Sequence, residues 1–102
     1  MFTDYPKAAT ENAKRAIRIK EEKERGCGTR EGWTRARQLA DRKPISLDTV
    51  RRMASFNRHR QNSAGDPKED CGALMWLAWG GTEGIDWAIR TSNANKMQFK
   101  SS

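Results

Sequence analysis

The sequence predicts an all-α fold, a compact single-domain bundle of four to five short helices. Apolar residues recur at helical spacing between capping residues and Gly or Pro breaks, and no strand pattern of useful length is present. The chain has 102 residues, enough for one domain that buries roughly 60 to 65% of its unfolded surface. We therefore expect a single helical domain over residues 1–91, followed by a flexible C-terminal tail over residues 92–102.

The first helix is predicted to run from Pro6 to about Arg25. Pro suits the first helical turn, and Gly26 and Gly28 are natural terminators. The packing face is rich in alanine, which permits the close approach of another helix. It consists of Ala9, Ala13, Ala16 and Ile17.

The second and third helices are separated by Pro44, which stops the second. The second is expected to run from Thr29 or Arg30 to about Arg42, and Ser46 caps the third, which frays after Asn57. The buried stripe of the second helix is predicted to comprise Trp33, Ala36, Leu39 and Ala40. The apolar contacts of the third are Leu47, Val50, Met53, Ala54 and Phe56.

The spacing of these two middle helices resembles a helix-turn-helix. Ala40 and Val50 are ten residues apart, as are the small residue of the first helix and an apolar residue of the recognition helix in that motif. Pro44 stands where the turn commonly has Gly, which favours a more extended connection. The alternative is two ordinary packed helices with solvated basic faces.

The fourth helix, Cys71 to Trp79, is predicted to be the Trp-rich central element because it is apolar on every side and Asp70 caps it. After the Gly80-Gly81 break, Thr82 caps a last helix that ends near Thr91. We expect three tryptophans of this region in the core, with partial exposure of Trp79 or Trp87 at a protein contact as the alternative. The three are Trp76, Trp79 and Trp87.

Positive charge is concentrated in the middle of the chain. Residues 30–60 hold nine Lys or Arg against three acids, whereas residues 61–90 hold two against five. Such segregation favours docking of one face on a polyanion, so nucleic acid is the predicted partner. The candidate nucleic-acid-binding residues are Arg35, Arg37, Arg42, Lys43, Arg51, Arg52, Ser55, Arg58, His59 and Arg60.

The ingredients of catalysis are thin, and we expect neither an enzyme nor a cofactor. The chain has one His, no nucleophile beside a base and no Gly-rich phosphate loop. Two Cys and His59 are too few ligands for a metal site, and the acidic loop before Asp70 is expected to be solvated. No apolar run is long enough to span a membrane.

The two cysteines lie in matched settings, each beside a Gly at a predicted helix end. Cys27 stands in Gly26-Cys27-Gly28 and Cys71 in Asp70-Cys71-Gly72. If the two ends meet, a disulfide or a close thiol pair would staple the first connection to the central helix. The first residues show no positive region followed by an apolar one, so we expect an intracellular, reducing setting, which favours two buried thiols.

Four groups of residues together resemble a family. They are Asp4-Tyr5-Pro6, Gly32-Trp33 with Gln38-Leu39-Ala40, Arg52-Met53 with Ser55-Phe56, and Trp76-Leu77 with Trp79-Gly80-Gly81 and Trp87-Ala88. Over about residues 4–90 the chain resembles a small uncharacterised helical domain of tailed-bacteriophage proteins, found alone or attached to head-assembly-related proteins. The resemblance implies action in the host cytoplasm during infection or in the virion, and no assigned activity.

The predicted function is thus a small non-catalytic phage protein that binds nucleic acid through the basic surface of residues 30–60. One alternative is an interaction module of the phage virion or head, whose basic face meets an acidic phage or host protein. In that case the Trp-rich C-terminal half would contact another copy and form an oligomer. A phage-encoded inhibitor of a host protein is a further alternative.

Overall fold

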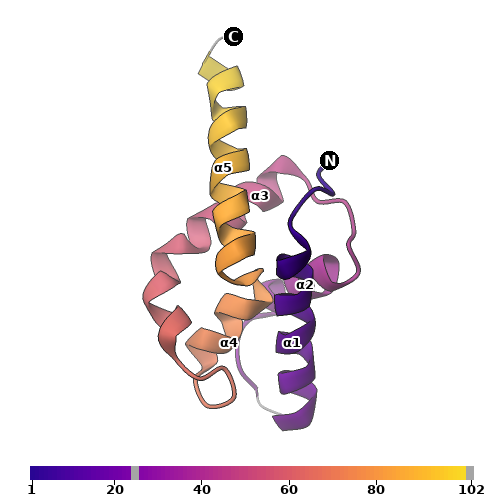
Figure 1. Ribbon diagram of the computed structural model, residues 1–102, viewed down its shortest axis with the longest axis vertical. Coiled ribbons are helices and arrows are strands. Elements are labelled where there is room, and N and C mark those ends of the chain that lie inside the picture. Colours follow the sequence, from indigo (N-terminus) through magenta and orange to yellow (C-terminus); the bar gives the residue numbers. More distant parts are fainter. Residues whose placement is uncertain (24–25, 101–102) are drawn as a thin grey trace.

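The computed structural model describes residues 1–23 and 26–100, the last five of them as backbone alone. Within these ranges the chain forms five α-helices and one 3₁₀-helix (Figure 1). They are α1 (Lys7–Lys23), α2 (Arg30–Ala40), α3 (Leu47–Ser55), η1 (Phe56–Ala64), α4 (Cys71–Ala78) and α5 (Gly81–Lys100). The described residues contain no β-structure apart from an isolated bridge between Phe2 and Ile45. The predicted all-α bundle is confirmed.

Side-chain caps start three of the helices at the predicted positions. The Thr29 hydroxyl accepts the Gly32 N–H at 3.1 Å before α2, and the Ser46 hydroxyl accepts the Thr49 N–H at 3.2 Å before α3. The Asp70 carboxylate accepts the Gly72 N–H at 2.8 Å before α4. Each cap satisfies a backbone donor that would otherwise lack a partner inside the helix.

Helix α4 is the central element, as its all-round apolar sequence predicts. It packs against α1, α2, α5 and η1, and its buried side chains include Leu74 and Trp76. The alanine face of α1 lies against α2, α4 and α5, with Ala9, Ala13 and Ala16 inaccessible to solvent. The three tryptophans of the C-terminal half are buried, being 2% (Trp76), 6% (Trp79) and 6% (Trp87) exposed.

The connection between α2 and α3 is pinned to the N-terminal segment. Ile45 is buried and exchanges two backbone hydrogen bonds with Phe2, at 2.8 and 2.9 Å, while the Tyr5 hydroxyl donates to the Lys43 carbonyl at 2.8 Å. Because the connection is extended and held in this way, α2 packs on α1 and α3 packs on α5. The two helices have the order of a helix-turn-helix pair, but their backbones do not pack on each other.

The C-terminal helix differs most from the prediction. Thr82 was expected to cap it, but α5 begins at Gly81, and the Thr82 hydroxyl instead accepts the Trp76 indole N–H at 3.2 Å. We predicted an end near Thr91 and an unstructured tail from Ser92, whereas α5 continues to Lys100 and extends beyond the rest of the bundle (Figure 1). No Gly or Pro follows Gly84, so no strong helix breaker interrupts it.

Helix α3 continues into η1 where fraying was predicted. The 3₁₀-helix runs over Phe56–Ala64, with a kink at His59, so it also covers the first residues of the expected loop over 62–67. Phe56 anchors this segment by stacking on Trp79, with 4.7 Å between the ring centroids. The predicted end of the first helix at Arg25 lies outside the described residues, and α1 ends at Lys23.

Candidate functional site

Two of the predicted phosphate-binding arginines are structural. Arg35 is 5% exposed, and its guanidinium lies 5.1 Å from the centre of the Trp79 ring and donates to the Gln38 side chain. Burial lowers the pKa of Arg35, and the Glu31 carboxylate at 3.7 Å opposes this shift. The helical spacing indicates a buried side chain at position 35, because this residue precedes buried Leu39 by one helical turn.

Arg42 is the second structural arginine. Its guanidinium donates to the Thr10 hydroxyl at 2.7 Å and to the Tyr5 carbonyl at 2.7 Å, and lies 4.5 Å from the centre of the Tyr5 ring. Burial raises the pKa of the Tyr5 hydroxyl, partly offset by the Arg42 charge. These contacts hold the N-terminal segment on the bundle, so the guanidinium is engaged within the protein.

Three further arginines, on α3 and η1, interact with neighbouring side chains. Arg52 pairs with Glu31 at 3.1 Å and with Asp48 at 3.0 Å, and the hydrogen bond to Glu31 is the main cause that raises its pKa. Arg60 pairs with Asp86, and Arg58 donates to the Ser55 hydroxyl at 2.7 Å. Because such pairs satisfy the guanidinium groups, phosphate would have to compete for them.

Several predicted site residues of α3 and η1 line a cavity of about 360 Å³, together with the stacked rings of Phe56 and Trp79. His59 packs on Phe56 with 4.8 Å between ring centroids, which gives this segment a packing role. Arg51 is exposed on α3 and does not line this cavity. The predicted residues around it are Arg52, Ser55, Arg58 and His59, with Glu31 as the acid.

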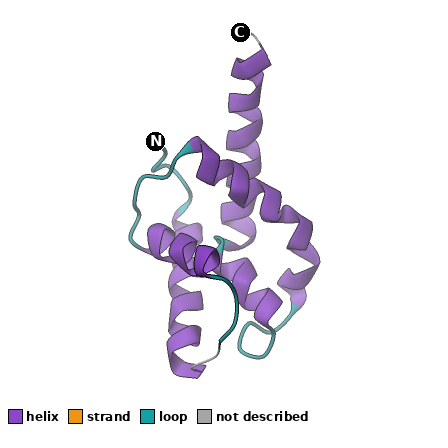
Figure 2. Ribbon diagram, turned by 180° about the vertical axis from the view of Figure 1, so that it is seen from behind, coloured by secondary structure: helices purple, strands orange, loops and turns teal. Residues whose placement is uncertain are grey.

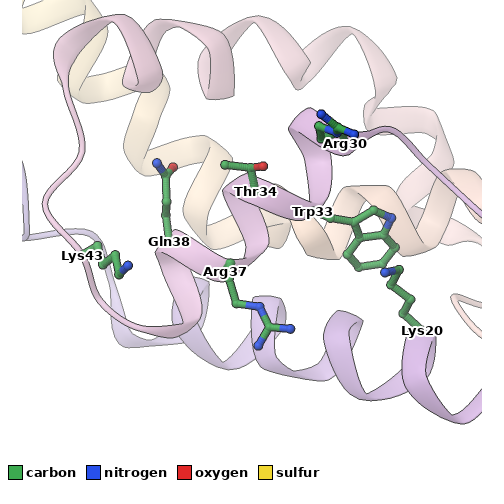
Figure 3. Close-up of a pocket in the computed structure, with 7 residues that line it drawn as sticks. All are labelled: Lys20, Arg30, Trp33, Thr34, Arg37, Gln38 and Lys43. Carbon is green, nitrogen blue, oxygen red and sulfur yellow. The ribbon is translucent and has the colours of Figure 1, made fainter.

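A different and more basic cavity, of about 600 Å³, lies along the outer face of α2 (Figure 3). We call it the basic pocket. It joins two predicted residues, Arg37 and Lys43, to five that the prediction of the site did not include, and it contains four cations and no acid. Its lining residues are Lys20, Arg30, Trp33, Thr34, Arg37, Gln38 and Lys43.

The helical period and the packing of two helices build the basic pocket. Arg30, Trp33, Thr34 and Arg37 recur at three- and four-residue spacing, which places them on one side of α2. That spacing was readable from the sequence. Lys20 comes from α1 and reaches toward the indole of Trp33, a neighbour set only by the tertiary packing of α1 on α2 (Figure 3).

Unlike Arg35, Arg52 and Arg60, the pocket cations form no ion pair within the described residues. Among the described residues, none forms a salt bridge with Arg30, Arg37 or Lys43. Lys20 Nζ lies 5.0 Å from the centre of the Trp33 ring, which attracts it without neutralising it. Helix α2 lies in front of α1 in the view of Figure 2, on the outside of the bundle. The pocket is therefore a surface where an anion would meet uncompensated positive charge.

Cys27 and Cys71 form a disulfide that fixes one end of the pocket. The bond joins the connection before α2 to the start of α4, and the Cys27 carbonyl accepts the Trp33 indole N–H at 2.8 Å. The two residues meet as the matched Gly settings predict. The expectation of two buried thiols is wrong because the two sulfurs are bonded to each other and Cys71 is exposed, whereas Cys27 is buried as expected.

Comparison with known proteins gives no match to a protein family, a curated protein or a solved structure. The resemblance to the phage domain therefore stays a prediction. In the part of the chain that the structure describes, no three His, Cys, Asp or Glu side chains converge in an arrangement suited to a metal ion. No helix there is long and apolar enough to cross a bilayer.

Proposed function

We propose that this protein binds nucleic acid through the basic pocket on α2, without catalysis. The observation that carries the proposal is the gathering of four cations and no acid around one pocket, three of them without an ion pair in the described structure. Phosphate neutralisation by such cations supplies most of the affinity of proteins for nucleic acid. The phage resemblance supplies the setting in which we place this activity.

The spacing of the pocket cations suits a phosphate chain. Arg30 and Arg37 are seven residues apart on α2, which is about 10 Å along a helix axis. This length corresponds to roughly three nucleotide steps of a stacked strand. Lys43 and Lys20 extend the charged surface beyond α2. A segment of a few nucleotides would therefore contact all four cations.

The position of Arg30 also favours an anion. It lies in the first turn of α2, where the positive end of the helix dipole repels a cation. A phosphate at this place would relieve the repulsion and interact with both the guanidinium and the helix end. By contrast, three arginines of α3 and η1, Arg52, Arg58 and Arg60, are already held by protein groups. We therefore assign the main contacts to α2 rather than α3.

The exposure of the side chains does not favour the alternative of an interaction module with a Trp-rich contact surface. Among the residues whose side chains the structure describes, 1–23 and 26–95, Met1 is the only exposed large hydrophobic residue, so none of the four tryptophans is offered as an exposed contact for another copy. An acidic protein partner would still fit the basic pocket by charge. The salt dependence of binding to nucleic acid separates that case from the proposal.

The test is fluorescence anisotropy with labelled DNA and RNA over roughly 50 to 200 mM salt. With all four cations engaged on a single strand, log affinity falls against log salt with a slope of about −3. Removing three of these charges is expected to weaken binding at all salt concentrations and to bring the slope toward about −1. The triple variant is Arg30→Gln, Arg37→Gln and Lys43→Gln.

The matched control removes three exposed charges that do not line the pocket, by Lys7→Gln, Arg15→Gln and Arg90→Gln. Both triple variants lose the same formal charge. The proposal requires that the pocket variant loses far more affinity than the control while its melting temperature stays close to that of the parent protein. Equal losses would mean that net charge, not the pocket, drives binding, and absence of binding at low salt would exclude the function.

A further inference from the structure

We infer that the basic pocket is built for single-stranded nucleic acid, with an unpaired base stacked on Trp33. This inference rests on the proposed function and adds the class of ligand. Its starting point is a difference among the four tryptophans. Trp76, Trp79 and Trp87 are at most 6% exposed, whereas Trp33 is half-buried and lines the pocket among the cations (Figure 3).

The Trp33 ring is held in place before any ligand binds. Its indole N–H donates to the Cys27 carbonyl at 2.8 Å, and Cys27 is itself tied to Cys71 by the disulfide. The ring therefore loses little conformational freedom when a ligand stacks on it, which makes it a favourable platform. Core packing alone does not explain why this indole also lines a pocket that contains four cations.

The chemistry of the ring selects an unpaired base. In a duplex both faces of each base are covered by neighbouring base pairs, so an aromatic ring on the protein surface gains no stacking contact without unstacking the duplex. An unpaired base offers a free face, and proteins that bind single strands combine such rings with cations that follow the backbone. Trp33, with Arg37 four residues later and Lys20 beside it, provides this combination.

Lys20 has a specific part in the inference. Its ammonium group lies over the Trp33 ring at 5.0 Å, a contact that a flexible four-carbon stem exchanges readily for another. When a base stacks on the indole, Lys20 is positioned to turn to the adjacent phosphate. Thr34 and Gln38 line the same pocket and supply hydrogen-bonding groups for base edges.

The experiment compares three probes of equal length: a mixed-sequence single strand, the corresponding duplex and an abasic single strand that has phosphates but no bases. We expect the parent protein to bind the base-containing strand more tightly than the abasic one. Trp33→Leu is expected to lower affinity for the base-containing strand roughly 5- to 150-fold, the effect of losing one stacked base, with affinities for the duplex and abasic strand unchanged. Trp33→Phe keeps a stacking ring and is expected to retain most of the binding.

Fluorescence gives a second readout that does not depend on affinity. Binding of the base-containing strand should quench part of the tryptophan emission of the parent protein, and Trp33→Phe should abolish that quenching because the other three rings are buried. Equal affinity of the parent protein for the abasic and base-containing strands would overturn the inference and leave the proposed function intact. So would an unchanged affinity of Trp33→Leu. Absence of binding to all three probes would overturn both.

Discussion

At the scale of single residues, Arg42 secures the N-terminal segment to the bundle. Its guanidinium reaches the Thr3 carbonyl at 3.0 Å, in addition to Thr10, the Tyr5 carbonyl and the Tyr5 ring. Arg42 adopts a left-handed backbone conformation, at φ 53°, which is unfavourable for most residues other than Gly. The several hydrogen bonds of the guanidinium offset that backbone cost.

These contacts predict that Arg42→Lys destabilises the protein although the charge is kept. An ammonium group lacks the planar fork, so it cannot make the same set of hydrogen bonds and stack on Tyr5. We expect a loss of about 1 to 2 kcal/mol in the free energy of unfolding, measured by urea denaturation. Arg37→Lys, on the exposed side of α2, is the matched control and should leave stability unchanged. If Arg42→Lys were as stable as the parent protein, the contacts of the Arg42 guanidinium would not stabilise the fold.

Whether a residue of the site was predictable from the sequence depends on how far away its partners lie in the chain. Arg37 and Lys43 follow from the density of positive charge alone. Arg30 and Trp33 were within reach, because their spacing to Arg37 places them on its side of α2. The intramolecular bonds of Arg42 were not, since its partners lie more than thirty residues away in the chain.

At the scale of elements, the crossing of α1 and α5 depends on two small residues. A Cβ atom added at Gly84 would lie 3.0 Å from the Cβ atom of Ala9, which is closer than such atoms normally approach. Ala9 is inaccessible to solvent, and its Cβ is fixed to the backbone of α1. Neither group can rotate away, so relief of the contact requires a shift of one helix against the other.

Gly84→Ala is therefore expected to destabilise the protein by about 1 kcal/mol. Overpacking in a tight core costs about 1 to 3 kcal/mol, and the better helix propensity of Ala returns up to about 1 kcal/mol. Thermal or urea unfolding gives the value. The paired change Ala9→Gly with Gly84→Ala exchanges the two side-chain sizes. A double variant that is more stable than the sum of the two single changes predicts would identify the contact as the cause. A stabilised Gly84→Ala variant would show that the helices adjust freely.

Elements were predictable wherever their signals are local. Thr29, Ser46 and Asp70 each cap a helix through an N–H two or three residues away, so the sequence nearby contains the whole interaction. Thr82 has the same cap chemistry, yet its hydroxyl is used by Trp76 of the preceding helix, and the Gly80-Gly81 turn starts α5 earlier. The turn is possible because both glycines have positive φ, at 111° and 67°.

At the scale of the whole molecule, the disulfide closes a large part of the chain into a loop. Cys27 and Cys71 are 44 residues apart, and the segment between them contains α2, α3 and η1. A link of this length removes many conformations from the unfolded state, which stabilises the folded one. The bond also joins the start of the pocket-bearing helix to the central helix, so it couples the site to the core of the bundle.

Reduction is thus expected to lower the free energy of unfolding by about 4 kcal/mol, the loop-closure value for this chain length. For a domain of 102 residues such a loss is a large share of the total stability, because small domains are marginally stable. Urea denaturation with and without reductant measures the difference, and mass spectrometry shows whether two hydrogens are gained. The double variant Cys27→Ser with Cys71→Ser is the control, which should be less stable and indifferent to reductant. If reductant adds two hydrogens and leaves the urea midpoint of the parent protein unchanged, the disulfide does not stabilise the fold. The Trp33 ring is then held by packing and by its hydrogen bond to the Cys27 carbonyl, without a contribution from the disulfide.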